Sequence, residues 1–199
     1  MLTERSADAL QLAFRLRHGH LRKGTAIPYV SHLIAVSSIA LEHGANEDEA
    51  IAALLHDAVE DAGGQPTLDK IRAQFGSAVA DIVDGCTDSY VVPKPDWRPR
   101  KEAYLAHLAT APQSVLLVSN SDKLHNARSI LSDLRVHSEA LWARFTALKE
   151  ETLWYYRSLV QVFASRRPSP LADELARVVG EVEGLADHSA VAVPNVPSR

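Results

Sequence analysis

Two histidines and two aspartates, set in three apolar segments of the chain, have the side chains of a metal site. His56 and Asp57 are adjacent and are the only polar residues between positions 50 and 59. His32 stands near the start of an earlier apolar segment, and Asp122 follows a third one. A charged group buried without a partner is very costly. Two imidazoles and two carboxylates together suit Mn²⁺, Fe²⁺ or Zn²⁺, with positions left for water and substrate.

Each of these residues has a plainer interpretation on its own. A single buried histidine is more often a hydrogen-bonded core residue, and an adjacent His-Asp pair alone favours neither interpretation. The four together, on apolar segments that must pack against one another, favour a metal site. A metal ion in such a site activates water and polarises phosphoryl oxygens. The predicted chemistry is therefore metal-assisted hydrolysis of a phosphate compound.

The segments that carry these residues show helical periodicity, which predicts an all-α, compact multi-helix bundle. Asn46 is expected to be the N-cap, with Glu49 completing a capping box, of the helix that contains His56 and Asp57. The expected helices run from Thr3 or Glu4 to about His18, from after Pro28 to before Gly44, from Asn46 to before Gly63, from Thr67 to Phe75, from Ser77 or Ala78 to about Thr87, from about Arg100 to Ala109, from about Pro112 to Ser129, from about Ser138 to Phe163, and from Leu171 to Leu185.

Composition describes an ordinary globular protein. The 199 residues are enough for one sizeable core, with 46% hydrophobic and 23% charged residues. A net charge of −4 gives no general reason to bind nucleic acid or an anionic membrane. A single cysteine, Cys86, excludes an internal disulfide framework. No apolar run reaches the ~20 residues of a membrane span, and the acidic N-terminus does not resemble a signal peptide. We therefore expect a cytoplasmic protein.

The order His, His-Asp, Asp resembles the signature of the HD phosphohydrolase superfamily. Additional motifs resemble, more narrowly, the hydrolase domain of the RelA/SpoT proteins and their stand-alone relatives, the small alarmone hydrolases, over residues 1–163. These motifs are Arg22-Lys23-Gly24, Pro28-Tyr29 before His32, Glu60-Asp61 after His56-Asp57, Phe75-Gly76, Thr87-Asp88, and the stretch from Asp122 through Asn126 to Arg128. The Glu-Asp pair separates this group from generic HD proteins.

The chain departs from the family pattern at two places. Leu33 follows His32 where the family commonly has proline. The sequence Ser119-Asn120-Ser121 precedes Asp122 where the family commonly has Lys-Leu-Ala. The second departure leaves the metal set intact but removes a lysine, so it bears on phosphate contacts and substrate preference.

The resemblance implies removal of pyrophosphate from the 3′ position of (p)ppGpp, giving GDP or GTP, with Mn²⁺ or another divalent transition metal as cofactor. It implies that His32, His56, Asp57 and Asp122 bind the metal. Glu60 and Asp61 lie one helical turn after His56 and Asp57, and we expect them to orient or deprotonate the attacking water and to transfer protons. Two acids at a helix C-terminus oppose the helix dipole, which favours a functional role for them.

The resemblance also implies that Arg22, Lys23, Asn126 and Arg128 contact the nucleotide. Basic loop residues are usually only solvated, and Arg128 is equally suited to a helix C-terminus. A larger basic group, Arg98, Arg100 and Lys101, borders a proline-rich loop; a solvated rim is the favoured interpretation, and closure over the outer phosphates is the alternative. The remaining histidines, among them His18, His20, His43 and His125, are expected to be structural or exposed.

Several alternatives stay open from the sequence. The substrate is a guanosine polyphosphate or another nucleotide such as NADPH, ppApp or a dNTP, or the chain is a non-catalytic HD protein that binds a partner. Antitoxin and housekeeping roles are not separated. We expect an HD hydrolase domain at residues 1–165, a C-terminal helical extension at 166–186 and a disordered tail at 187–199, with no synthetase segment. The extension packs either on its own bundle or on a second copy in a homo-oligomer.

Overall fold

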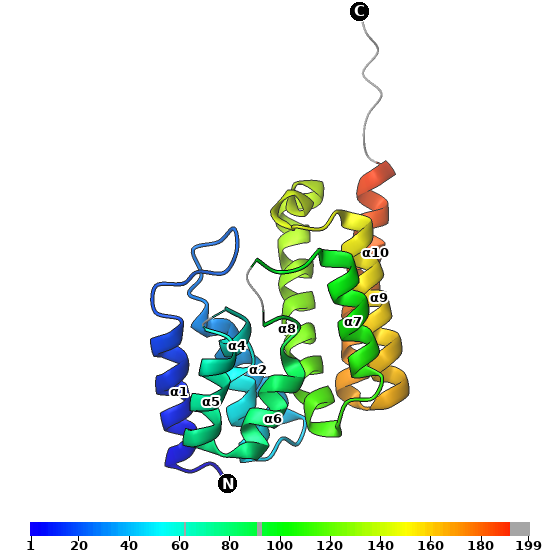
Figure 1. The fold of residues 1–199 in the computed structure, drawn as a ribbon. Coiled ribbons are helices and arrows are strands. Elements are labelled where there is room, and N and C mark those ends of the chain that lie inside the picture. The colour runs from blue at the N-terminus through cyan, green and yellow to red at the C-terminus, as the bar shows by residue number, and fades with distance from the viewer. Residues whose placement is uncertain (62, 91–92, 192–199) are drawn as a thin grey trace, which may run out of the picture.

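The longest helix, α8 (Gln113–His137), runs through the middle of the molecule and contacts helices on both of its sides (Figure 1). One group consists of α2 (Val30–Glu42), α3 (Glu47–Leu55) and α6 (Ser77–Cys86), and the other of α9 (Lys149–Arg166) and α10 (Pro170–Val191). The other helices are α1 (Glu4–Leu16), α4 (Ala58–Asp61), α5 (Gln65–Phe75), α7 (Trp97–Leu108) and the 3-10 helix η1 (Ser138–Arg144). Helix α8 is therefore placed to supply side chains to any site between the two groups.

The computed structural model describes residues 1–61, 63–90 and 93–191, apart from the side chains of Asp61 and residues 188–191. Within these ranges the chain is helical with connecting loops, and one isolated bridge between Leu21 and Pro28 is its sole β-type pairing. The prediction of an all-α bundle is confirmed. None of the described helices is long and apolar enough to span a bilayer.

The capping box predicted at the start of α3 is present. Asn46 accepts a hydrogen bond from the Glu49 backbone N–H at 3.0 Å, and its own N–H donates to the Glu49 carboxylate at 2.8 Å. These two bonds satisfy backbone donors that a helix N-terminus otherwise leaves unpaired. They fix the starting point of α3, and with it the position of the His-Asp pair at the other end of the helix.

Several helix boundaries differ from the sequence prediction. Helix α8 continues past Ser129 to His137. The predicted single helix from Ser138 to Phe163 is wrong, because Ser138 has a φ of 49°, a short 3-10 helix follows it, and α9 begins only at Lys149. Helix α7 begins at Trp97, before the predicted start at about Arg100. Pro99 is tolerated in its first turn because the N–H that proline lacks would have no helical partner there.

The C-terminal helix α10 packs along α8 and α9 of its own chain. It continues to Val191, past the predicted end at Leu185. The predicted disordered tail at 187–199 thus begins inside this helix, and its last part, 192–199, lies outside the described residues. The division of the chain into a domain at 1–165 and an extension at 166–186 stays a prediction.

Helices α6 and α8 approach closely at Gly85, and this contact yields a prediction. A Cβ atom at Gly85 would lie 2.6 Å from Cγ2 of Val115, whose side chain is buried and stiff. We expect Gly85→Ala to lower the free energy of unfolding by about 1–3 kcal/mol, because the helices must move apart. Chemical denaturation measures this change.

Gly180 in α10 is the matched control, because a Cβ atom there meets nothing within 4 Å. Gly180→Ala should raise the free energy of unfolding by about 0.5–1 kcal/mol, the usual gain for alanine in a helix. Adding Val115→Ala should restore part of the stability lost in Gly85→Ala. Equal stabilisation by both alanine substitutions would show that the α6–α8 contact tolerates a side chain.

Candidate metal centre and adjoining cavity

The four predicted metal ligands come together in the structure. His32 lies in the first turn of α2, His56 and Asp57 form the turn between α3 and α4, and Asp122 lies on α8. His56 Nε2 is 3.1 Å from Asp57 Oδ2, and His32 Nε2 is 3.2 Å from Asp122 Oδ1. The two cross distances, His32 Nε2 to Asp57 Oδ2 and His56 Nε2 to Asp122 Oδ1, are both 3.6 Å. One donor atom of each residue therefore faces a common centre.

This arrangement fits a divalent cation. Donors held at about 2.0–2.2 Å from one ion stand about 3–3.5 Å apart, close to the distances seen here. The Nε2 atom of His56 is buried and has no hydrogen-bond partner in the described part of the chain. A buried polar atom without a partner is destabilising by about 1–3 kcal/mol, and a bound cation removes that penalty. We conclude that His32, His56, Asp57 and Asp122 are suited to hold a metal.

The electrostatics of the four residues are strongly coupled. Burial opposes protonation of His56, but the Asp57 and Asp122 carboxylates outweigh it and hold the pKa of His56 well above its ordinary value. Burial likewise opposes ionisation of both aspartates. His56 and His32 nevertheless hold the pKa of Asp57 well below its ordinary value, and Lys123 with the histidines does the same for the pKa of Asp122. Both carboxyls are therefore ionised near neutral pH, as metal ligands must be.

Backbone carbonyls at the junction of α3 and α4 orient the His-Asp pair. His56 Nδ1 lies 2.8 Å from the Ala53 carbonyl oxygen and donates to it, so Nε2 faces the centre and carries the lone pair whenever the ring is neutral. Arg17 donates to the Asp57 carbonyl oxygen at 2.8 Å. Because these side chains occupy carbonyls that helical N–H groups normally use, the predicted single helix from Asn46 is interrupted at His56 and Asp57.

His125 has the same orienting role for His32. The two Nδ1 atoms are 2.8 Å apart, so one must donate and the other accept. Burial and the neighbouring His32 and Arg22 lower the pKa of His125 to about 4, so its ring is neutral at pH 7. His125 Nδ1 can then accept from His32 Nδ1–H, which leaves Nε2 of His32 free to bind a metal.

Comparison with known proteins agrees with this geometry. The family described as "HD domain" matches residues 9–154. The chain belongs to the HD-domain family. HD domains bind divalent metals, and His32, His56 and Asp57 offer donor atoms within 4.8 Å of one another.

Individual curated relatives each match more than half of the chain. A guanosine-3′,5′-bis(diphosphate) 3′-pyrophosphohydrolase of Xenopus tropicalis is 35% identical over 125 residues, which are 58% of this chain and 67% of that protein. A probable GTP pyrophosphokinase of Mycobacterium leprae is 34% identical over 126 residues, 61% of this chain but 16% of that protein. This HD-domain chain thus matches only a small part of the longer bacterial relative.

Two solved structures extend the likeness to the fold. One, described as "A metazoan ortholog of SpoT hydrolyzes ppGpp and plays a role in starvation responses", has a TM-score of 0.75 and 25% identity. The alignment covers 93% of this chain and 98% of that one. The other, from Listeria monocytogenes EGD-e, has a TM-score of 0.66 and 31% identity over 74% of this chain and 96% of that one. The first of these alignments extends well past the 9–154 family match, so the C-terminal part of the HD-domain chain resembles that structure as well.

A cavity of about 520 Å³ adjoins the HD metal centre. Three residues that line the cavity also contact the proposed ligand aspartates: Tyr29, Lys123 and Asn126. The Tyr29 hydroxyl donates to Asp57 Oδ2 at 2.5 Å. Lys123 and Asn126 each donate to Asp122 at 2.6 Å. Aromatic rings and cations make up much of the remaining wall: Trp97, Phe145, Tyr155, Tyr156, Arg22, Lys23 and Lys101. Such a wall suits a nucleoside phosphate.

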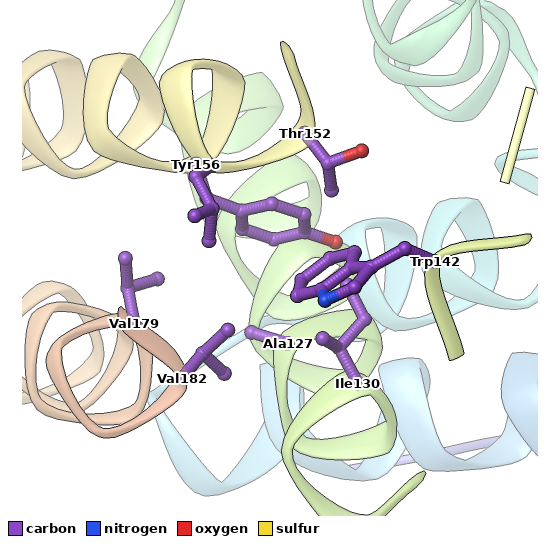
Figure 2. Close-up of a pocket in the computed structure, with 8 residues that line it drawn as sticks. Ala127, Ile130, Trp142, Thr152, Tyr156, Val179 and Val182 are labelled. Atoms are coloured by element: carbon purple, nitrogen blue, oxygen red, sulfur yellow. The ribbon is translucent and has the colours of Figure 1, made fainter. Parts of the chain in front are cut away.

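A second, much smaller cavity lies deeper between α8, α9 and α10. It holds about 10 Å³, and Figure 2 shows the Tyr156 ring pointing toward Trp142 there, with Val179 and Val182 contributed by α10. Ile130, Thr152 and Tyr156 line both cavities. A space of this size holds about one water molecule. Of these two cavities, only the larger has room for a molecule the size of a nucleotide.

Three of the four predicted nucleotide contacts line that larger cavity. Arg22 donates to the Asn126 side-chain oxygen at 3.0 Å, and Lys23 donates to Thr146 at 3.2 Å. Arg128 lies elsewhere: its guanidinium contacts Glu174 of α10 at 2.5 Å, and it does not line the cavity. We leave Arg128 out of the nucleotide contacts proposed below.

The two predicted catalytic acids lie on α4. The Glu60 carboxylate pairs with Lys94, and burial followed by the charge of Asp88 raises its pKa above the ordinary value, although Lys94 acts in the opposite direction. The side chain of Asp61 lies outside the described residues.

Only part of the basic group beside the proline-rich loop is a solvated rim, since Arg98 is 42% exposed but Arg100 and Lys101 are not. Arg98 stacks on Trp154, with its guanidinium carbon 3.4 Å from the ring centroid. Arg100 and Lys101 both pair with Asp88, and their side chains are only 11% and 15% exposed. Lys101 lines the large cavity. The favoured interpretation from sequence is therefore wrong for Arg100 and Lys101.

Lys123 and His125 were not predicted to take part in the site, and Lys101 was predicted to contact phosphates only as the less favoured alternative. Lys123 and Lys101 line the cavity, and His125 orients His32. Position in the sequence offered a signal for two of them, since Lys123 is adjacent to Asp122 and His125 is one helical turn after it. Their partners come from distant segments, which is why the sequence alone did not assign their roles.

The His125–His32 bond predicts an effect on metal affinity. His125→Ala removes the acceptor of His32 Nδ1–H, so the affinity for a divalent metal should fall about 10- to 100-fold, the usual effect of losing such a bond. Competition with a chelating dye measures the affinity. His18→Ala, which changes an exposed histidine, is the control. An affinity unchanged in His125→Ala would exclude the orienting role.

The raised pKa of His56 predicts that protons compete with the metal. His56 binds a metal only as neutral imidazole, so below its pKa a proton must leave before the metal binds. Metal affinity should therefore rise as the pH increases above the ordinary histidine value of 6.5, with net proton release on binding. Calorimetric titration in two buffers of different ionisation enthalpy counts the protons. An affinity that is flat across this range would contradict the coupling.

Proposed function

We propose that this HD-domain chain is a metal-dependent hydrolase that removes pyrophosphate from the 3′ position of (p)ppGpp and leaves GDP or GTP. The observation that carries the proposal is the shared wall between the metal centre and the large cavity, formed by Tyr29, Lys123 and Asn126. It allows a nucleotide in the cavity to present a phosphate to the metal ligands. The name of the Xenopus relative and the ppGpp hydrolysis described for the metazoan SpoT ortholog support this substrate.

The reaction needs one water and two proton movements. The water oxygen bonds to the phosphorus attached to the ribose 3′ oxygen, and the bond between that phosphorus and the 3′ oxygen breaks. The water gives up a proton, and the 3′ oxygen takes one to become a hydroxyl group. A divalent cation at the centre supplies Lewis acidity for the water and the phosphoryl oxygens.

The chain's own residues supply the proton transfer. Glu60 keeps its proton to higher pH than an ordinary glutamate, because burial and Asp88 raise its pKa, and it is suited to protonate the departing 3′ oxygen. We assign Asp61 to the attacking water, as its base. The pairing of Glu60 with Lys94 holds the carboxyl in position before substrate enters.

The residues of the cavity wall bind and orient the substrate. Arg22, held by Asn126, and Lys23 provide positive charge for a polyanionic substrate. Asn126 also donates to Asp122, so a nucleotide that moves Asn126 acts directly on a metal ligand. Tyr156 and Phe145 offer aromatic faces to a base.

Three finer points belong to the same proposal. Mn²⁺ is the proposed metal, because a mixed set of imidazole and carboxylate donors suits it. The proposed location is the cytoplasm. The proposed biological role is control of alarmone levels in the stringent response.

Turnover of a nucleotide panel tests the proposal. Wild-type protein with Mn²⁺ should release pyrophosphate from ppGpp and pppGpp, and much less phosphate or pyrophosphate from ppApp, NADPH or dNTPs. Asp57→Ala should remove both activity and metal binding. Rapid turnover of NADPH or a dNTP, with ppGpp left intact, would reject the proposed substrate.

A double variant of the two acids separates catalysis from metal binding. Glu60→Gln with Asp61→Asn should lower kcat for ppGpp by about 10²- to 10⁴-fold, the range for losing acid–base groups. Metal affinity should change little, since neither residue is assigned to the metal. Glu4→Gln with Asp8→Asn gives the same change of net charge at exposed positions of α1. Full activity of the Glu60→Gln, Asp61→Asn variant would exclude the assignment of these two acids to proton transfer.

A further inference from the structure

A buried arginine at the end of α1 contacts one proposed metal ligand by two routes. Arg17 follows the last residue of α1 and is 6% exposed. Its guanidinium donates to the backbone carbonyl of Asp57 at 2.8 Å. The same guanidinium lies over the ring of Tyr29, 4.4 Å from the ring centroid, and the Tyr29 hydroxyl donates to Asp57 Oδ2 at 2.5 Å. Arg17 therefore holds the backbone of Asp57 directly and its carboxylate through Tyr29.

The oxygen that Tyr29 contacts is the one that faces the metal centre. Asp57 Oδ2 is 3.1 Å from His56 Nε2 and 3.6 Å from His32 Nε2. A shift of the Tyr29 ring would move its hydroxyl, and the carboxylate would lose its fixed direction toward both imidazoles. Hydrogen-bond partners of this kind orient the donor atoms of metal ligands, and losing one commonly lowers metal affinity.

Helix α1 gives Arg17 a defined position beside the end of α3. At the start of both helices, Thr3 donates to Glu47 Oε1 from its backbone N–H at 2.6 Å and from its hydroxyl at 2.9 Å. The two helices contact each other, and Ala13, one turn before Arg17, is buried. At their other end, Arg17 reaches Asp57. Helices α1 and α3 thus run in the same direction and are joined at both ends.

We propose that Arg17 is a positioning residue for the metal centre, which acts on Asp57 through its carbonyl and through Tyr29. The inference rests on the proposed metal-dependent function but not on its substrate, since none of these contacts involves a nucleotide. Charge alone predicts the opposite effect, because a guanidinium beside Asp57 repels a bound divalent cation. Orientation must outweigh this repulsion. The sign of the change in metal affinity on removing Arg17 therefore separates positioning from charge.

Competition with a chelating dye, without nucleotide, measures the Mn²⁺ affinity of each variant. Arg17→Met should lower the affinity about 10- to 100-fold, and Tyr29→Phe, which removes only the hydroxyl, about tenfold. Arg17→Lys keeps a cation for the ring and a donor for the carbonyl, so it should recover part of the affinity lost in Arg17→Met. Arg15→Met, at an exposed arginine in the last turn of α1, is the control with the same loss of charge.

Combining the variants tests the route through Tyr29. In the Tyr29→Phe background, Arg17→Met should lower the Mn²⁺ affinity by a smaller factor than in the wild type, because the ring no longer passes the effect of stacking to the carboxylate. Factors that simply multiply would overturn this route.

Unfolding with and without Mn²⁺ separates positioning from a purely structural role. An arginine that only stabilises the fold would lower the free energy of unfolding equally in both conditions. Positioning predicts that Arg17→Met also reduces the added stabilisation from Mn²⁺. An unchanged Mn²⁺ increment, or an affinity of Arg17→Met equal to or above that of the wild type, would overturn the proposal. A wild type that binds Mn²⁺ but leaves ppGpp intact would reject the proposed substrate instead, and the affinities would still decide the role of Arg17.

Discussion

The need to keep four polar side chains together inside an apolar bundle governs this structure. His32 and His56 are almost fully buried, and the Asp57 and Asp122 carboxylates that face them are ionised, because their pKa values are lowered. Such groups are tolerated in a core only when each has a partner of opposite or complementary character. Helices α2, α3 and α8 must therefore meet at one point, and the small residues Ala50, Ala52 and Ala53 of α3 let them approach. The positions of these helices are therefore set by the four polar side chains as well as by apolar packing.

The partners of these four residues connect the centre to its surroundings. His56 is oriented by a backbone carbonyl, His32 by His125, and Asp57 by Tyr29. Asp122 accepts a hydrogen bond from Asn126, which in turn accepts one from Arg22 at the cavity. Because these orienting groups lie on α3, on α8 and in the segment before α2, damage to the fold at any of these places changes the geometry of the centre. Stability and binding are thus linked through hydrogen bonds and not only through the apolar core.

The sequence was informative where a residue type alone determines its behaviour. Histidine and aspartate in apolar helices need partners wherever they are placed, so it was predictable that the four proposed ligands come together. The capping box at Asn46 depends only on residues three apart. The roles of Lys101 and His125 depend on segments that lie far away in sequence, so no local pattern shows them. Arg128 illustrates the opposite case, since its spacing from Asp122 matched the motif while α10 provided a competing partner, Glu174. The break at Ser138 depends on a single positive φ that serine seldom adopts.

Helix α8 also sets the spacing between side chains along the cavity wall. Asp122, Asn126, Ser129 and Asp133 follow one another at helical spacing, from the metal centre along the cavity wall. At about 1.5 Å per residue they span about 16 Å, close to the length of an extended nucleotide. An insertion between Asp122 and Asp133 would turn everything beyond it by about 100°, so length changes in this stretch should be excluded during evolution. The connection after η1 contributes Phe145, Thr146 and Ala147 to the cavity wall without that constraint, and it is where relatives can change what they recognise.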